Sequence, residues 1–428
     1  MGSAAKRGAV CCVAVIVAFT LIYQASRFYL AWNLGRSSTL SGQIRGAKLE
    51  GNAEAWDRIG EALATNFNDP QPERAQRFFQ TAVRLDPRSA HYWMDLAEIF
   101  ETQGQISKAL DAYHRAQAEY PSSANVAWRY GNFLLRQGET SRALAQIRRA
   151  IVADGTLAPL AIAQVWSVDP SVDALLNSVL PHNRGFYFEA LGFLSAKHDD
   201  RAALQTWAKI QTMAASKPLN LPLVFPLINE LISADRAMDS EHVWRQALKA
   251  ARWPEVPPSA GSVVWNGGFE APVANGGLDW RFDEKPGDYI SIDAYTYHSG
   301  SRSLRVDFTG GANLDFAGVQ QFVPVQPKTG YLFQCFMRTR AITTDSGMRF
   351  EIVDLNHGEV NVHTHALIGT SAWTPLSVAF TTGPDTHFVD IRLRRYPSKL
   401  FDNKLSGTVW VDDVTLVPDG NEDPGSSK

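Results

Sequence analysis

The sequence predicts a multidomain α + β protein in which a helical repeat region precedes an antiparallel β-sandwich. Three observations lead to this prediction. An apolar run stands near the N-terminus, residues 50–252 carry a helical pattern that recurs at an offset of 34 residues, and residues 262–418 form short alternating runs separated by turn residues. The first observation predicts a membrane-spanning helix, the second an α-solenoid and the third the sandwich.

Length and composition limit the classes of protein that fit. The chain has 428 residues, which allows two or three domains that each bury a core. Charged residues make up 20% and the formal net charge is -3, so we predict no nucleic-acid partner. Of the three cysteines, Cys11 and Cys12 lie in the apolar run and Cys335 in a strand pattern, so no disulfide framework is expected.

Lys6 and Arg7 precede an apolar run from Gly8 to Tyr23 that continues to Trp32. Roughly 20 apolar residues cross a bilayer, so residues 1–33 are expected to form a cytoplasmic tip and a signal anchor. A cleaved signal peptide and a buried soluble helix are the alternatives. Flanking charges do not settle the orientation of this segment.

The helical region repeats itself at an offset of 34 residues. Gly104 then matches Gly138, Ala109 matches Ala143 and Ala116 matches Ala150. Small residues at these positions let two antiparallel helices approach closely. Residues 56–155 resemble tetratricopeptide repeats, and prolines interrupt the period in residues 157–252. The copy with the best match carries Trp93, Leu96, Ala97, Phe100, Gly104, Ala109, Tyr113, Ala116 and Pro121.

This resemblance implies that residues 50–252 bind a protein partner. The alternative is that their polar helix faces are only solvated. Residues 253–261 follow, with three prolines in five residues, and are expected to form a stiff linker. The tail 419–428 is polar and is expected to be disordered.

Five short motifs in residues 262–418 appear in the order found in one family of sandwiches. They resemble carbohydrate-binding modules of the jelly-roll, galactose-binding-like type that accompany xylanases and glucanases. The resemblance implies a jelly roll, a polysaccharide ligand and an extracytoplasmic location, with a bacterial inner membrane and periplasm as the setting. The motifs are Asn266–Glu270, Ser299–Val306, Gly318–Gln321, Trp373–Leu376 and Gly407–Leu416.

Strand alternation sorts the side chains of the sandwich into inward and outward sets. In the runs 331–340, 348–355 and 387–396 we assign the polar sides to one shared outer face rich in Arg. Planar hydrogen-bonding groups and an aromatic ring suit a sugar, and Arg suits the carboxylate of an acidic sugar. A solvated face with cross-strand ion pairs is the alternative. The predicted sugar-binding residues are Gln334, Arg338, Arg340, Arg349, Glu351, Asp390, Arg392, Arg394 and Tyr396.

The resemblance also implies a structural calcium ion near the first and last strands. Alternation in Trp410–Leu416 places Asp412 on the same side as Val414 and Leu416, where a carboxylate needs a partner. Glu270 and Asp412 are the predicted calcium ligands. A hydrogen-bonded Asp412 without a metal is the alternative.

No sequence motif of a hydrolase, a metalloprotease or a nucleotide-binding enzyme is present, so we predict that the protein is not an enzyme. The predicted function is a membrane-anchored, carbohydrate-binding scaffold that handles or exports surface polysaccharide. The alternative is a purely protein–protein scaffold whose sandwich binds no sugar.

Overall fold

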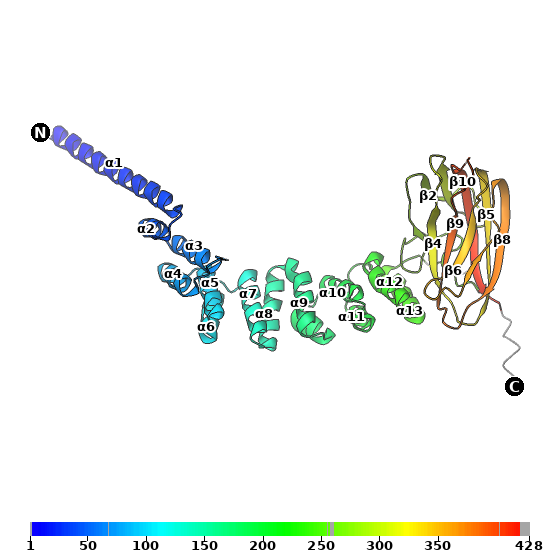
Figure 1. Cartoon of the computed structure of the whole chain (residues 1–428), viewed down its shortest axis with the longest axis horizontal. Helices are drawn as coiled ribbons and strands as arrows, with labels where there is room; N and C mark the ends of the chain where they lie inside the picture. The colour runs from blue at the N-terminus through cyan, green and yellow to red at the C-terminus, as the bar shows by residue number, and fades with distance from the viewer. Residues whose placement is uncertain (1, 67, 255, 257–260, 402, 420–428) are drawn as a thin grey trace. The chain divides into compact units, whose positions relative to one another are not determined.

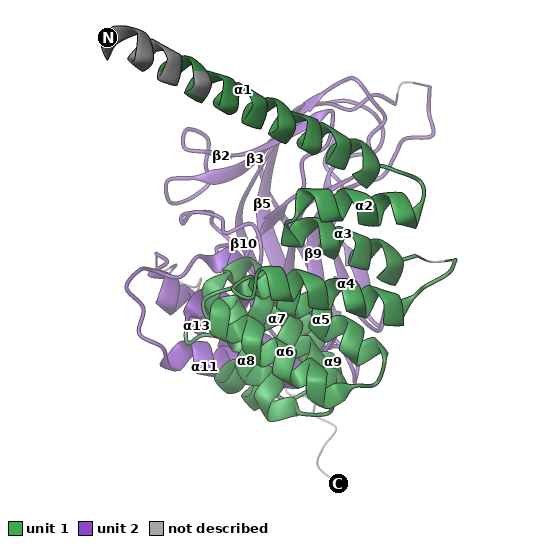
Figure 2. Ribbon diagram, turned by 90° about the vertical axis from the view of Figure 1, so that its left-hand side faces the viewer, with its two compact units in different colours: residues 1–182 green, residues 183–428 purple. Residues whose placement is uncertain are grey.

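The computed structural model describes residues 2–66, 68–254, 256, 261–401 and 403–419, with side chains from residue 10 onward except that of residue 12. It divides into two compact units, residues 1–182 and 183–428 (Figure 2). Helices are followed along the chain by two antiparallel sheets (Figure 1), which confirms the predicted fold class. Most of the predicted linker and nearly all of the predicted disordered tail lie outside the described residues.

The first unit begins with α1 (Gly2–Gly35), which is followed by α2 (Leu40–Glu50). In the described part of α1, Val13–Gly35 has a mean hydropathy of 1.6 and none of its most apolar window is buried, so it is long and apolar enough to cross a membrane. Arg27 interrupts the apolar surface, and its Nε donates to the carbonyl of Leu49 at 2.7 Å. The cation near the end of α1 is therefore bound to the polypeptide of α2.

Antiparallel helix pairs make up the rest of the first unit. Gly104 and Gly138, with φ of +70° and +77°, form the turns inside two successive pairs. Ala97, Ala109 and Ala143 are fully buried where facing helices touch, as the repeat pattern predicts. The helices are α3 (Ala53–Ala64), α4 (Pro72–Leu85), α5 (Ala90–Thr102), α6 (Ile106–Glu119), α7 (Ala124–Arg136), α8 (Thr140–Ala153), η1 (Gly155–Leu157), α9 (Ala158–Val168) and η2 (Ala174–Val179).

The second unit starts with a further set of helices before the chain turns to strands. Trp207 in α11 and Trp244 in α13 are both buried. The elements are α10 (Arg184–Ala196), α11 (Asp200–Thr212), η3 (Leu221–Leu223), α12 (Phe225–Ser233) and α13 (Ala237–Ala251).

Two five-stranded sheets pack face to face and enclose one apolar core that includes Phe333, Phe350 and Ile391. Sheet A has the order β1-β4-β9-β6-β7, and sheet B has the order β2-β3-β10-β5-β8. Every pairing between these named strands is antiparallel. The strands are β1 (Arg281–Phe282), β2 (Asp288–Asp293), β3 (Ser303–Thr309), β4 (Phe316–Pro324), β5 (Gly330–Ile342), β6 (Arg349–Asp354), β7 (Asn361–His363), β8 (Gly369–Thr381), β9 (Phe388–Arg395) and β10 (Ser406–Pro418).

A β-bulge in β10 reverses the face on which the following residues lie. The register shifts between Asp412 and Thr415, and Asp413 has φ of +50°. Val411 before the shift and Val414 after it both enter the core, so Asp412 lies on the opposite face from Val414. The prediction that Asp412 shares an apolar side with Val414 and Leu416 is therefore wrong. Alternation cannot detect an inserted residue.

Helices α12 and α13 pack directly on the sandwich within the second unit. The rings of Trp244 and Trp265 meet edge to face at 6.3 Å between centroids. Asp235, in the turn between the two helices, accepts hydrogen bonds from Asn356 Nδ2 at 2.9 Å and His387 Nδ1 at 2.6 Å, both in the sandwich. The chain changes from helix to strand at the predicted linker, yet one compact unit extends across it.

Two adjacent glycines allow this contact. A Cβ atom on Gly277 would lie 2.5 Å from the ring of Trp244, and one on Gly276 would lie 2.4 Å from the ring of Phe225. Gly277 also has φ of +64°, which favours glycine. The sandwich loop and the helices therefore meet only because these two positions have no side chain.

We expect Gly277→Ala to weaken the helix–sandwich contact by about 1–3 kcal/mol, because the new methyl group overlaps Trp244. Gly369→Ala is the matched control, since Gly369 has φ of +66° and no atom lies within 4 Å of an added Cβ. Hydrogen exchange of α13 in the full chain should rise in Gly277→Ala and not in the control. Equal exchange in the two variants would contradict the close-packing argument.

Candidate functional site

The predicted sugar-binding residues lie on two different sheets. β5 carries Gln334, Arg338 and Arg340 and belongs to sheet B, whereas β6 and β9 belong to sheet A. Because the two sheets pack through their apolar sides, their polar sides face away from each other. The predicted single shared face is therefore wrong. Alternation shows which residues of a strand point outward, but it does not show to which sheet the strand belongs.

The larger group lies on sheet A and is called here the Glu351 face. Glu351 on β6 pairs in register with Arg392 on β9, and Arg349 pairs with Arg394. Glu351 Oε1 accepts from Arg349 at 2.9 Å, and its Oε2 accepts from Arg392 at 3.2 Å. Arg394 Nε lies 3.8 Å from Glu351 Oε2, so three guanidinium groups surround this carboxylate. The face comprises Arg349, Glu351, Asp390, Arg392, Arg394 and Tyr396.

Tyr396 follows β9 and is the aromatic residue of this face. The guanidinium of Arg394 lies 4.0 Å from the centre of its ring, and that of Arg349 lies 4.9 Å from it. Tyr396 is 42% exposed, whereas Glu351 is 3% exposed. The ring is therefore accessible beside a carboxylate that is covered by its arginine neighbours.

The pKa values of the two carboxylates of the Glu351 face are shifted in opposite directions. Burial alone would raise the pKa of Glu351, but hydrogen bonds from Arg349 and Tyr396 and the charge of Arg392 hold that pKa below its usual value. Burial raises the pKa of Asp390 to about 6, although Arg392 and Arg281 oppose the shift. Oδ1 of Asp390 has no hydrogen-bond partner among the described residues. Glu351 is thus a stable anion, and Asp390 is a poorly compensated one.

A cavity of about 630 Å³ opens between α13 and the sandwich, within the second unit. Trp244, Trp265 and Phe322 line it together with the polar residues Glu241 and His387. Phe322 on β4 pairs in register with Asp390 on β9, so the cavity borders the Glu351 face at Asp390. Helices α12 and α13 therefore border the β1–β4 side of this outer face.

The outer face of sheet B has a different centre, which sequence reasoning missed. Trp410 is only 4% exposed, and the guanidinium groups of Arg305, Arg338 and Arg340 lie 5.2–5.6 Å from its ring centre. Its Nε1 donates to Asp293 Oδ2 at 2.8 Å. This indole is covered by side chains and cannot act as an open stacking surface in this arrangement. The alternation of Thr408 and Trp410 with Val409 and Val411 is the signal that could have placed it outward.

Glu270 and Asp412, the predicted calcium ligands, both accept hydrogen bonds from the loop 298–302. Asp412 is fully buried, and its Oδ2 accepts from the backbone N–H of His298 at 2.7 Å and of Ser299 at 3.1 Å. Glu270 accepts from the backbone N–H of Ser301 at 2.7 Å. Burial raises the pKa of Asp412 to about 6 despite these bonds. The carboxylates are hard oxygen donors of the kind calcium prefers, and each already has protein partners.

Comparison with known proteins covers both parts of the chain. The tetratricopeptide repeat model matches residues 71–124 and 100–159. These residues are tetratricopeptide repeats. No curated protein matches the chain.

Solved structures similar to the chain include helical and β proteins. The enzymatically active domain of tailspike protein 4 from bacteriophage CBA120 is 11% identical with a TM-score of 0.28, and the match covers 37% of this chain and 22% of that one. A CBM22-1 xylan-binding domain from Paenibacillus barcinonensis is 13% identical with a TM-score of 0.25, over 32% of this chain and 85% of that one. PilF of Pseudomonas aeruginosa is 16% identical with a TM-score of 0.24, over 47% of this chain and 89% of that one.

The predicted order of parts is confirmed: a region that matches the tetratricopeptide repeat model precedes a sandwich of two antiparallel sheets. Whether the residues of the Glu351 face bind a sugar stays a prediction.

The buried carboxyl of Asp390 predicts a pH effect on the sandwich. Its pKa in the folded state is above the usual value, so its contribution to stability is fully present below about pH 4 and is lost as pH rises through about 6. As pH rises from about 4.5 to 7.5, we expect the stability of Asp390→Asn to increase by about 1–2 kcal/mol relative to that of the wild type. Local opening free energies from hydrogen exchange of β9 measure this gain. A difference that does not change with pH would contradict the assignment.

Proposed function

We propose that this protein is a non-catalytic, membrane-anchored scaffold whose sandwich binds carbohydrate at the Glu351 face. The observation that carries the proposal is the exposed ring of Tyr396 beside a carboxylate held by Arg349 and Arg392. An aromatic ring can pack on the C–H side of a pyranose, and planar charged groups can bind its hydroxyls. The setting we propose is the handling or export of surface polysaccharide.

The charges of the Glu351 face favour an acidic sugar. Three arginines (Arg349, Arg392 and Arg394) outnumber the two carboxylates of the face, and Arg394 also pairs with the exposed carboxylate of Asp315. Because the side chain of Asp315 is exposed, a sugar carboxylate can replace it as the partner of Arg394 in a bidentate pair. Binding would therefore exchange one ion pair for another.

A purely structural role for the sandwich is the competing proposal. It is supported by the same ion pairs, since the outward arginines of β6 and β9 already have carboxylate partners in the structure. Cross-strand ion pairs of this kind are common on solvated sheet faces. In that case only the repeats recruit partners.

The anchor proposal rests on α1. Residues 8–26 carry no charged side chain, and at about 1.5 Å per residue this stretch spans roughly 28 Å. Arg27, the next cation, has a backbone partner in α2. We propose a cytoplasmic N-terminus with the repeats and the sandwich outside the inner membrane of a bacterium.

A glycan array probed with the full chain in detergent tests the sugar proposal. The full chain is needed because α12 and α13 pack on the sandwich. We expect binding to glycans that contain uronic acids or other carboxylates. Tyr396→Ala and Arg392→Ala should each weaken it about 10-fold or more, equivalent to about 1.4 kcal/mol, since each removes a direct contact.

Arg338→Ala is the matched control for this experiment. Arg338 also points outward from a strand and lies near an aromatic ring, but it belongs to sheet B. Its loss should leave glycan binding unchanged. Binding of no acidic or neutral glycan would support the scaffold-only alternative, and equal loss in all three variants would place the ligand elsewhere.

We also propose the structural calcium ion that the resemblance implies, with Glu270 and Asp412 as ligands. A Cβ on Gly268 would lie 3.8–3.9 Å from both side chains, so they flank the same loop position. Oδ1 of Asp412 and Oε2 of Glu270 each accept one hydrogen bond, from Asp413 N and Ser301 Oγ respectively, which leaves a lone pair on each. Backbone carbonyls would supply the remaining ligands that calcium needs.

Calcium should raise the melting temperature of the sandwich by several degrees, because an ion that binds only the folded state stabilises it. The measurement is calorimetry of the full chain with calcium and with a chelator, compared with Asp412→Asn. The shift should vanish in the variant. An unchanged wild-type transition would establish the alternative, a hydrogen-bonded Asp412 without a metal.

A further inference from the structure

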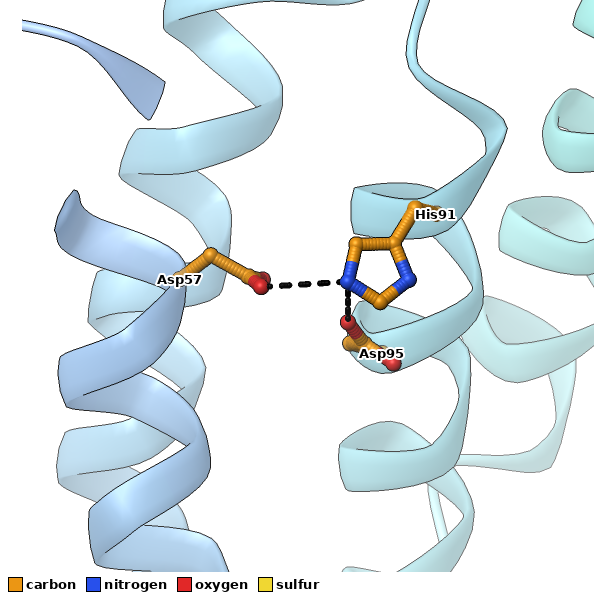
Figure 3. Close-up of side chains that lie close together, drawn as sticks. All are labelled: Asp57, His91 and Asp95. Atoms are coloured by element: carbon orange, nitrogen blue, oxygen red, sulfur yellow. Dashed lines mark ion pairs between the residues drawn. The ribbon is translucent and has the colours of Figure 1, made fainter. Parts of the chain in front are cut away.

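Three side chains from neighbouring repeats converge in the first unit, far along the chain from the sandwich. Asp57 on α3 and Asp95 on α5 both point toward the same ring nitrogen of His91 on α5 (Figure 3). His91 Nε2 lies 3.4 Å from Asp57 Oδ2 and 3.4 Å from Asp95 Oδ2. Of all the described residues, only these form a group of three or more possible metal ligands within 4.8 Å of one another.

The repeat architecture explains why these residues meet. Asp57 and His91 are separated by one 34-residue period, so they occupy equivalent positions on the first helices of adjacent repeats. His91 and Asp95 are four residues apart on one helix and therefore share a face. Asp95 on α5 and Arg129 on α7 are a second pair of residues separated by 34 positions, so they too lie at equivalent places on adjacent repeats.

The distances match a metal site better than an ion pair. A hydrogen-bonded ion pair of this kind has about 2.7–2.9 Å between nitrogen and oxygen. In a tetrahedral site with bonds of about 2.0–2.2 Å, neighbouring ligand atoms are about 3.3–3.6 Å apart. His91 Nε2 has this spacing from two oxygens at once, as one corner of a tetrahedron has from two others, and all three ligand atoms lie within 4.8 Å of one another.

The surroundings provide a second, independent observation. The side chain of Asp57 is only 6% exposed, and its Oδ1 has no hydrogen-bond partner among the described residues. A buried carboxylate oxygen without a partner is costly, and a cation would compensate it. Asp95 is oriented from behind, because its Oδ1 accepts from Arg129 Nη2 at 2.8 Å. Outer hydrogen bonds of this type orient the ligands of known metal sites.

We propose that Asp57, His91 and Asp95 bind a divalent transition-metal ion, for which Zn²⁺ is the best match. One imidazole with two carboxylates suits zinc, whereas calcium needs six to eight oxygen ligands. The side chain of His91 is 59% exposed, so the fourth coordination position is open to water or to a ligand atom of a partner. The ion would join the first helices of two adjacent repeats.

Isothermal titration of the tag-free full chain in detergent with Zn²⁺ tests this site. We expect binding of one ion, weakened at least 10-fold in His91→Ala and in Asp57→Asn. His114→Ala and Asp111→Asn on α6 are the matched controls, because both residues are exposed on a repeat helix outside the cluster. Circular dichroism at the helical wavelengths checks that every variant is folded.

A spectroscopic measurement on the unmodified chain keeps the proposal testable if a variant does not fold. Co²⁺ in this site should give the intense visible absorption of tetrahedral coordination, and Zn²⁺ should remove that absorption. No stoichiometric ion, or binding equally strong in the two cluster variants and the controls, would overturn the proposal. Glycan binding plays no part in either measurement.

Discussion

The two sheets of the sandwich can bury their apolar sides only against each other, and this constraint determines where any ligand can bind. Inward residues such as Phe333 and Phe350 fill the space between the sheets. Every outward polar residue is thereby assigned to one of two surfaces that face opposite directions. On one surface a tryptophan is covered by arginines, and on the other a tyrosine is open beside a carboxylate.

Local periodicity is what the sequence reveals best. The helix pairs were predictable because each contact in a repeat joins residues close in the chain, and matching positions recur after 34 residues. Inward and outward residues of β5, β6 and β9 were also sorted correctly by their period of two. Both patterns depend only on nearby residues.

Properties that depend on distant pairing were not predictable in this way. Nothing within β5 shows that it pairs with β8 and β10 while β6 pairs with β9, so the candidate residues were placed on one face and not two. The bulge near Asp413 adds one residue without a sequence marker. The Asp57–His91–Asp95 group was not predicted from the sequence, because its members meet only when two repeats stack.

The packing of α12 and α13 on the sandwich also determines where the chain can be cut into separate fragments. A helical solenoid exposes an apolar face at its last repeat and needs a cap there. In the second unit, the loop of Gly276 and Gly277 covers Phe225 and Trp244 at this position. The sandwich thus serves as the terminal cap of the helices it follows. A cut at the prolines of the predicted linker would expose apolar surface on both fragments. We therefore expect the last helices and the sandwich to be inherited together, as one unit.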